Sequence, residues 1–388
     1  MTPVNRDMSP QLEAEQAVLG ACLLDPAQLA LLKEWLEPRH FYRPAHEGFF
    51  AILLAQHTAG HPALALAPDT DADAEAKADW AITAITTATR EVPGFSASYG
   101  HTLIAACPRP AHAAAYGRMV LETAVRRALE EHAHRLLHAA ETEAVEAAVE
   151  LTGALHTVIA RLADAWGTID QRPRPLPTPP TRPAAAKAAE AARHNEQMLL
   201  SSLISSTKQI PRTASWLKAE DFVDTGHRAV FNAMAALAHR REPVDELTVL
   251  WEVQRRGALA AGVITVAEVR DLCAEGFPGD PDYWAEHVLH AALLRAAATS
   301  AGIVRVMALD ASIAAGPLLG SAVRALAPAD RVQERLRSAT ATPARTGPVV
   351  LGAARRKGAA LSRSPAPPPS PAARPADRTG ETTVRSRR

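Results

Sequence analysis

The chain has 388 residues, and its 42 basic and 42 acidic side chains cancel to no net charge. Hydrophobic residues make up 47% and aromatic residues only 4%, which excludes a wholly disordered chain and favours packed helices over β-sandwiches. No apolar run approaches the roughly 18–20 residues of a membrane span, and the N-terminal stretch does not resemble a signal peptide. Three isolated cysteines form neither a disulfide framework nor a zinc site. These features predict a reduced cytoplasmic protein with no membrane partner.

Capping signals and apolar spacing predict helices throughout the first half of the chain. In chain order they are a helix from Ser9-Pro10 to about Leu24, one opened by a capping box at Asp25–Gln28, one after Pro44, and long helices over Tyr116–Ala140 and Glu143–Trp166. Gln171–Pro183 follows and is nearly half proline. Such a segment favours extended polyproline II, a semi-rigid spacer on the order of 35–40 Å long.

The second half predicts a similar series of elements. A capping box is expected at Ser206–Gln209, a helix after Asp224-Thr225, and a long helix over Tyr283–Leu309. No convincing strand is found, so the predicted fold class is all-α. The predicted domains are residues 9–168 and 187–338, joined by a proline-rich linker over 169–186 and followed by a disordered basic tail over 339–388.

The two halves are an internal repeat. A shift of 181 residues aligns them without a gap from Glu15 to Pro62, and the matched residues include scarce Trp, His and Phe side chains. Duplication explains this better than chance. The matched pairs include Glu15-Gln16 with Glu196-Gln197, Trp35 with Trp216, Phe41 with Phe222, His46 with His227, and Phe50 with Phe231. The aromatic members, Phe41, Phe50, Phe222 and Phe231, are predicted core residues.

The C-terminal tail is strongly basic. From Thr340 to Arg388 there are ten Lys or Arg and two Asp or Glu, a net +8, so the rest of the neutral chain carries −8. Clustered cations neutralise phosphates, which predicts salt-dependent DNA binding without sequence preference. A solvated, solubilising tail is an equally good interpretation. The residues proposed to contact DNA are Arg355, Arg356, Lys357, Arg385, Arg387 and Arg388.

Two strings resemble the N-terminal domain of DnaB-family replicative DNA helicases. They are LEAEQAVLGACLLDP at Leu12–Pro26 and FYRPAHEGFFAIL at Phe41–Leu53, with a weaker third likeness at Tyr116–Val120. The family usually has Asp where this chain has His40, and the second copy restores that acid as Asp221 but has Val223 in place of Tyr42. The resemblance implies helical domains that pair into a collar and present a surface to primase or to a helicase loader.

The motor of such helicases is missing from the sequence. A phosphate-binding loop needs G-x-x-x-x-G-K-[ST], whose backbone amides and Lys hold phosphate while its Ser or Thr holds magnesium. Nothing in the chain matches this pattern. The chain is therefore predicted not to be an enzyme, with no catalytic residue and no cofactor.

Histidines are the remaining candidates for chemistry. His46 and His227 are predicted to begin corresponding helices, and structural roles are favoured because no nucleophile or carboxylate recurs near both. The His46-Glu47 pair lacks the second His of a zincin motif. His134 and His138 are one helical turn apart, but a solvated helix face is favoured over a metal site. No metal site is predicted.

The sequence thus predicts a non-catalytic interaction module of DNA replication, whose partners are a replicative helicase, primase or helicase loader. Two alternatives remain open. One is a DNA-binding accessory protein that acts through its tail, in which case the protein would associate with the bacterial nucleoid. The other is the collar subunit of a split helicase whose motor is another chain. Tethering favours pairing of the two copies within one chain, with weaker self-association between chains, although two independent domains on a stiff spacer are nearly as plausible.

Overall fold

The described part of the protein is built from helices joined by turns and short non-helical segments. The structure, a computed structural model, describes residues 9–65, 71–167, 175–178, 186–274 and 279–341. These residues form 14 α-helices and 5 short 3₁₀ turns without a strand, so the all-α prediction is confirmed. In the first half the helices are α1 (Pro10–Leu24), α2 (Ala27–Leu32), α3 (Pro44–Thr58), α4 (Asp71–Glu91), α5 (Ala97–Ala106), α6 (Ala113–Glu141) and α7 (Val145–Trp166).

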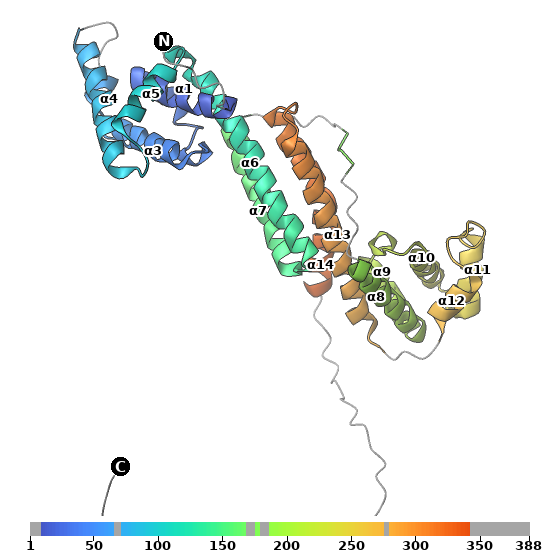
Figure 1. Ribbon diagram of the computed structural model, residues 1–388. Coiled ribbons are helices and arrows are strands. Elements are labelled where there is room, and N and C mark those ends of the chain that lie inside the picture. The colour runs from blue at the N-terminus through green and yellow to red at the C-terminus, as the bar shows by residue number, and fades with distance from the viewer. Residues whose placement is uncertain (1–8, 66–70, 168–174, 179–185, 275–278, 342–388) are drawn as a thin grey trace, which may run out of the picture. The chain divides into compact units, whose positions relative to one another are not determined.

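The second half continues this series after the proline-rich segment (Figure 1). Its helices are α8 (Ala186–Ser205), α9 (Ile210–Trp216), α10 (Thr225–Arg240), α11 (Glu246–Arg255), α12 (Val266–Cys273), α13 (Pro281–Leu309) and α14 (Ala315–Ala341). The 3₁₀ turns are η1 (Pro38–His40), η2 (Pro62–Leu64), η3 (Pro110–His112), η4 (Thr207–Gln209) and η5 (Ala219–Asp221). The helices predicted after Pro44 and after Asp224 begin at those positions, as α3 and α10.

Both predicted capping boxes are wrong. Asp25 accepts the Ala27 N–H and the side-chain amide of Gln28, but it makes no reciprocal box, and Ser206 makes no side-chain cap at all. In both copies the reciprocal bonds occur later, in η1 and η5. The capping signals therefore pointed to the beginning of α2 and η4, whereas the reciprocal bonds form about ten residues later, in η1 and η5.

The first head, which we define as α1–α5 with the beginning of α6, has its own core. Three aromatic side chains lie at its centre, and all are fully buried: Phe49, Phe50 and Trp80. Gly20 lets α1 approach α5 closely, because a Cβ at this position would lie 2.1 Å from the Leu103 carbonyl oxygen. The second head, α8–α12 with the beginning of α13, has a separate core around Phe222, Phe231 and Val249.

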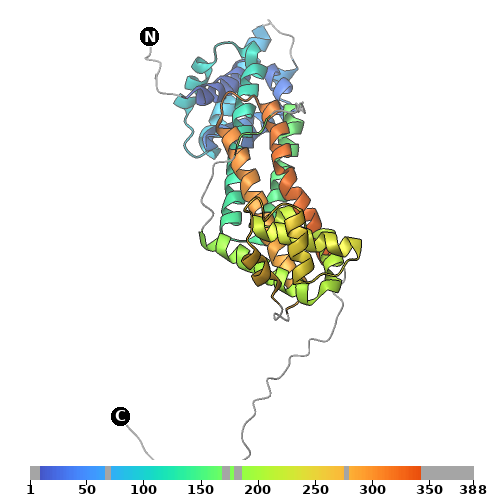
Figure 2. The same cartoon turned by 90° about the vertical axis from the view of Figure 1, so that its right-hand side faces the viewer.

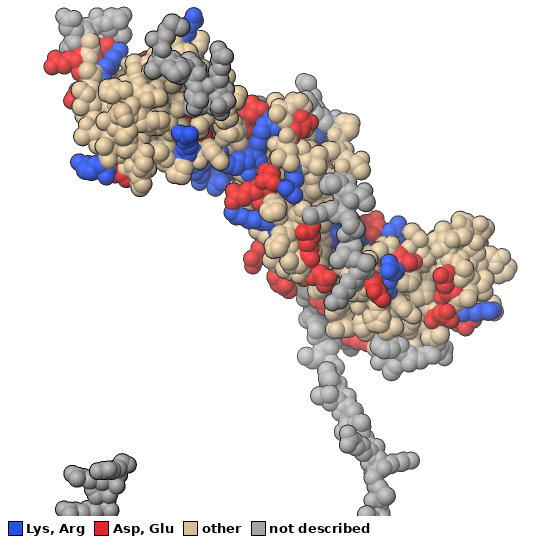
Figure 3. Space-filling model, in the orientation of Figure 1, with Lys and Arg blue, Asp and Glu red and all other residues tan. Residues whose placement is uncertain are grey.

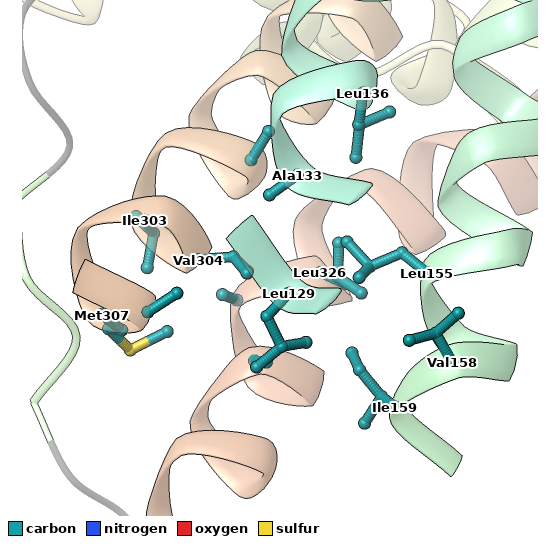
Figure 4. Close-up of a cluster of buried hydrophobic side chains, with 14 of the residues drawn as sticks. Leu129, Ala133, Leu136, Leu155, Val158, Ile159, Ile303, Val304, Met307 and Leu326 are labelled. Carbon is teal, nitrogen blue, oxygen red and sulfur yellow. The ribbon is translucent and has the colours of Figure 1, made fainter. Parts of the chain in front are cut away.

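The four remaining helical segments form what we call the shared bundle. The hairpin α6–α7 from the first half lies beside the hairpin α13–α14 from the second, and both views show them running side by side (Figures 1 and 2). Their side chains meet in one core: Leu129, Leu155 and Ile159 pack with Val304, Met307 and Leu326 (Figure 4). The two halves of the chain are thus paired through a common core.

Polar contacts add to this pairing at the edges of the shared bundle. Arg126 of α6 donates to backbone carbonyls in the α13–α14 turn, among them that of Asp310 at 2.6 Å. Arg305 of α13 bonds Glu130 of α6 at 3.0 Å, so each hairpin supplies an arginine to the other. Basic and acidic side chains are interspersed over the surface in view (Figure 3).

Helix α13 contains a long apolar stretch. Among the described residues it is the single helix long and apolar enough to span a membrane, although the sequence was expected to contain no such run. Half of its apolar window is buried inside the protein, in the cores of the second head and the shared bundle. These contacts identify α13 as a core helix.

Of the proline-rich linker, residues 175–178 are described. Leu176 packs against the shared bundle, so at this point the linker touches the protein instead of crossing solvent. The rest of the expected polyproline spacer lies outside the described residues.

Candidate functional site

A glutamate and a histidine are buried together in the first head. Glu15 of α1 is 1% exposed and His46 of α3 is fully buried, and Glu15 Oε2 lies 2.7 Å from His46 Nδ1. The same carboxylate accepts the backbone N–H of Tyr42 at 2.6 Å and that of Arg43 at 3.4 Å. A buried carboxylate requires such partners. Glu15 thus ties the first turn of α3 to α1.

The second head contains the same arrangement. Glu196 Oε2 lies 2.8 Å from His227 Nδ1, and its carboxylate accepts the backbone N–H groups of Val223 and Asp224. The argument that no carboxylate recurs beside both histidines was therefore wrong. The signal was present in the sequence, since the 181-residue shift aligns Glu15 with Glu196 as well as His46 with His227.

The two heads differ in what contacts the second ring nitrogen, Nε2, of the buried histidine. In the first head Tyr99 of α5 places its hydroxyl 2.7 Å from His46 Nε2, and the hydroxyl also accepts from Gln16 Nε2 at 3.0 Å. The rings of His46 and Tyr99 are nearly parallel, 7° apart. When His46 Nδ1 donates to Glu15, Nε2 is left to accept the phenol proton. Tyr99 therefore closes the first site, and sequence reasoning did not find it.

In the second head the corresponding place is open. The His227 ring lines a cavity of about 270 Å³, together with Gln197, Asp224, Ile264, Glu268 and Asp271. His227 has no hydrogen bond at Nε2 among the residues described, and its side chain keeps 15% of its exposure where His46 has none. A cavity of this size is slightly below the usual range for small-molecule sites and suits a single side chain.

His40 and Asp221 hold equivalent turns together by different chemistry. The Glu37 N–H donates to His40 Nδ1 at 3.0 Å, and the Lys218 N–H donates to Asp221 Oδ2 at 2.7 Å. Burial lowers the pKa of His40 to about 4, and Arg39, Arg161 and Arg127 act in the same direction against Glu37. The neutral ring can therefore accept a hydrogen bond as a carboxylate would. This explains how the first copy does without the usual Asp.

His40 should make the first head acid-sensitive. Because its folded pKa lies below the ordinary 6.5, the neutral ring stabilises the fold above pH 6.5, and that stability is lost as pH falls towards 4. The loss approaches about 1.4 kcal/mol per pH unit for one proton. Denaturant unfolding at several pH values is expected to show a shallower slope in His40→Asp, which copies Asp221. Equal slopes in this window would contradict the assignment.

The family comparison agrees with the repeat. The model for the DnaB-like helicase N terminal domain matches residues 7–70 and 189–277. Both segments are similar to the DnaB-like helicase N-terminal domain. The first match ends at residue 70, immediately before α4 begins. Both glutamate–histidine pairs lie inside the matched segments.

Curated relatives of the DnaB family match shorter parts of the chain. Replicative DNA helicase DnaB of Mycobacterium leprae (strain TN) is 34% identical over 126 residues, 32% of this chain and 19% of that protein. The DnaB of Geobacillus stearothermophilus is 51% identical over 51 residues, 13% and 11% of the two chains. Replicative DNA helicase DnaC of Bacillus subtilis (strain 168) is 43% identical over 60 residues, 15% and 13% of the two chains. The chain thus spans less than a fifth of each relative.

The predicted aromatic residues lie inside the DnaB-like heads. Phe41 and Phe50 pack with ring centroids 4.9 Å apart, and Phe222 and Phe231 with centroids 4.8 Å apart, all four nearly or fully buried. His134 and His138 are exposed on α6, and the described residues hold no cluster suited to a metal ion. The proposed DNA-binding residues of the tail, Arg355, Arg356, Lys357, Arg385, Arg387 and Arg388, lie outside the described residues.

Proposed function

We propose that this protein is a non-catalytic interaction module of DNA replication that binds a replicative helicase, primase or helicase loader. We also propose that its two heads act as one unit, with the domain division at 9–168 and 187–338. The observation that carries the proposal is the pairing of two DnaB-like segments through the shared bundle of one chain. A buried apolar interface of this kind holds two binding surfaces in a fixed relation.

The absence of chemistry is part of the proposal. The described residues hold no sheet of the kind a RecA-like motor needs, and the sequence lacks the phosphate-binding loop. The purified chain is expected not to hydrolyse ATP. A mutation-sensitive ATPase activity in the purified protein, measured as phosphate release, would contradict the non-catalytic assignment.

The partner can be tested directly. The full chain should co-sediment with the purified replicative helicase, primase or loader of the source bacterium in analytical ultracentrifugation. Each candidate is assayed separately, so that binding identifies one of them. Unchanged sedimentation of all three in the presence of the chain would reject the proposed role in replication. Tail-driven DNA binding is a separate question, answered by deleting residues 340–388 and measuring DNA binding at several salt concentrations.

A further inference from the structure

The cavity beside His227 is the feature of the heads that the pairing does not explain. It is half-open, and its lining combines apolar side chains with acceptor groups. Val263, Ile264 and Leu272 form the apolar part, and the rest of the lining is Gln197, Asp224, Thr225, Gly226, His227, Glu268 and Asp271. No Lys or Arg is among these ten residues.

In the first head the corresponding place beside the histidine is filled by the Tyr99 side chain. Ser96 caps α5 by accepting the Tyr99 N–H, and Thr265 caps α12 by accepting the Glu268 N–H, both at 3.2 Å. Tyr99 and Glu268 are therefore equivalent positions on equivalent helices. Further along these helices, the Leu103 carbonyl lies against Gly20, and the Leu272 carbonyl accepts from Ser201, the counterpart of Gly20.

This correspondence defines how the second site differs. Tyr99, which bonds His46 Nε2, is replaced by Glu268, whose Oε2 turns back to accept from Thr265 N at 2.7 Å and Thr265 Oγ1 at 2.8 Å. The phenol is thus missing, while the histidine and the glutamine that held it remain as His227 and Gln197. The second head keeps the binding groups and lacks the intramolecular ligand.

The charge of the site has also reversed. Arg43, which donates to the Tyr99 hydroxyl at 3.4 Å, corresponds to Asp224, and Thr102 corresponds to Asp271. One positive charge has become three negative charges. The bonds from Thr265 hold the pKa of Glu268 below its ordinary value, so this carboxylate is ionised at neutral pH. Glu268 and Asp271 lie one helical turn apart on the same face of α12.

We propose that the cavity beside His227 binds an arginine side chain of a protein partner, in the place that Tyr99 occupies in the first head. Glu268 Oε1, Asp224 Oδ2 and the Asp271 carboxylate carry no hydrogen bond within the described part of the chain and can all accept. A guanidinium has only donors, arranged in a planar fork that fits two carboxylates. Its aliphatic stem packs against Val263 and Ile264.

A metal ion fits the site less well. Among the described residues no three His, Cys, Asp or Glu side chains converge as metal ligands do. A phenol would repeat the first head's contact with the histidine but carries no positive charge to balance the three carboxylates. The charge reversal therefore favours arginine over both, and each of these ligands becomes an outcome of the test.

The test uses the full chain with isotope-labelled isoleucine methyl groups, since Ile264 lines the cavity. N-acetyl-arginine methylamide is the probe, with the citrulline, lysine and tyrosine analogues and MgCl₂ and ZnCl₂ as comparators. Saturable shifts of the Ile264 methyl signal with the arginine probe, and weaker or no shifts with citrulline, are expected. Equal response to citrulline, a stronger response to the lysine or the tyrosine probe, or response to metal ions alone would overturn the proposal.

Two variants of the cavity test whether arginine binding depends on Glu268 and Asp271. Glu268→Gln with Asp271→Asn retains a residue able to complete the capping box, removes both charges, and is expected to weaken arginine binding at least about tenfold. Glu268→Tyr copies the first head and is expected to abolish it. Glu220→Gln, an exposed glutamate outside the cavity, is the matched control. Unchanged affinity in both cavity variants would overturn the proposal.

The arginine site rests on the proposed function only in taking a replication protein as the partner. The site and the proposed function can therefore fail separately. Arginine binding without any replication partner would leave the site in place and reject the function. Binding of a replication protein that survives Glu268→Tyr, together with no response to the arginine probe, would reject the site and keep the function.

Discussion

Replacing Glu15 and Glu196 together with alanine is expected to unfold both heads at room temperature. Each substitution leaves a buried histidine nitrogen and two backbone N–H groups without an acceptor. Each unpaired buried donor costs about 1–3 kcal/mol. Because the pairs lie in separate cores, their costs should add. The sum is comparable with the roughly 5–15 kcal/mol that stabilises a typical domain.

The measurement is helical circular dichroism during denaturant unfolding, with the two single variants beside the double. Glu47→Ala with Glu220→Ala is the matched control, because these glutamates are exposed, one in each head. Glu15→Gln with Glu196→Gln keeps the side-chain shape and one acceptor oxygen, so an intermediate loss is expected. An unfolding midpoint in the double alanine variant equal to that of the control would show that the pairs are dispensable.

Replacing Leu326 with aspartate is expected to open the shared bundle. Leu326 is fully buried in the apolar core formed by both hairpins. Truncating such a leucine costs about 2–5 kcal/mol, and burying an unpaired carboxylate adds several kcal/mol more. Opening the hairpins exposes the introduced carboxylate to water and relieves that cost. The heads have their own cores and are expected to remain folded.

Small-angle scattering distinguishes the paired from the opened state. The wild-type chain should give a single-peaked distance distribution, and Leu326→Asp should give two separated lobes with most of the helical content retained. Val323→Asp is the matched control, since this valine lies on the same helix and is 40% exposed. A single-peaked distribution in Leu326→Asp would mean that the hairpins are not what joins the halves.

The sequence predicted the parts of the fold that depend on local signals. The repeat shift paired Phe41 with Phe222 and His46 with His227, and the helices containing these histidines begin at the expected residues. The shared bundle was harder to predict in detail. Its helices are rich in alanine and leucine, and an apolar stripe records that a face is buried but not which helix covers it.

The difference between the histidine sites of the two heads could not be predicted from the sequence, because the repeat register changes between them. Tyr99 and Glu268 correspond at a shift of 169 residues, whereas the gap-free repeat at 181 ends near Pro62. Between these regions α4 has 21 residues and α11 has 10, and this difference breaks the register. The equivalence becomes visible through the caps at Ser96 and Thr265, which require the folded helices.

Covalent linkage of the two halves changes how the protein can evolve. In a homodimer every substitution appears on both sides of the interface, so a change useful in one place must be tolerated in the other. Here α6–α7 and α13–α14 have separate sequences, so a substitution in one hairpin leaves the other hairpin unchanged. Arg43 and Asp224, opposite charges at matching places, can therefore coexist in one molecule. The two heads can therefore diverge independently while the shared bundle still joins them.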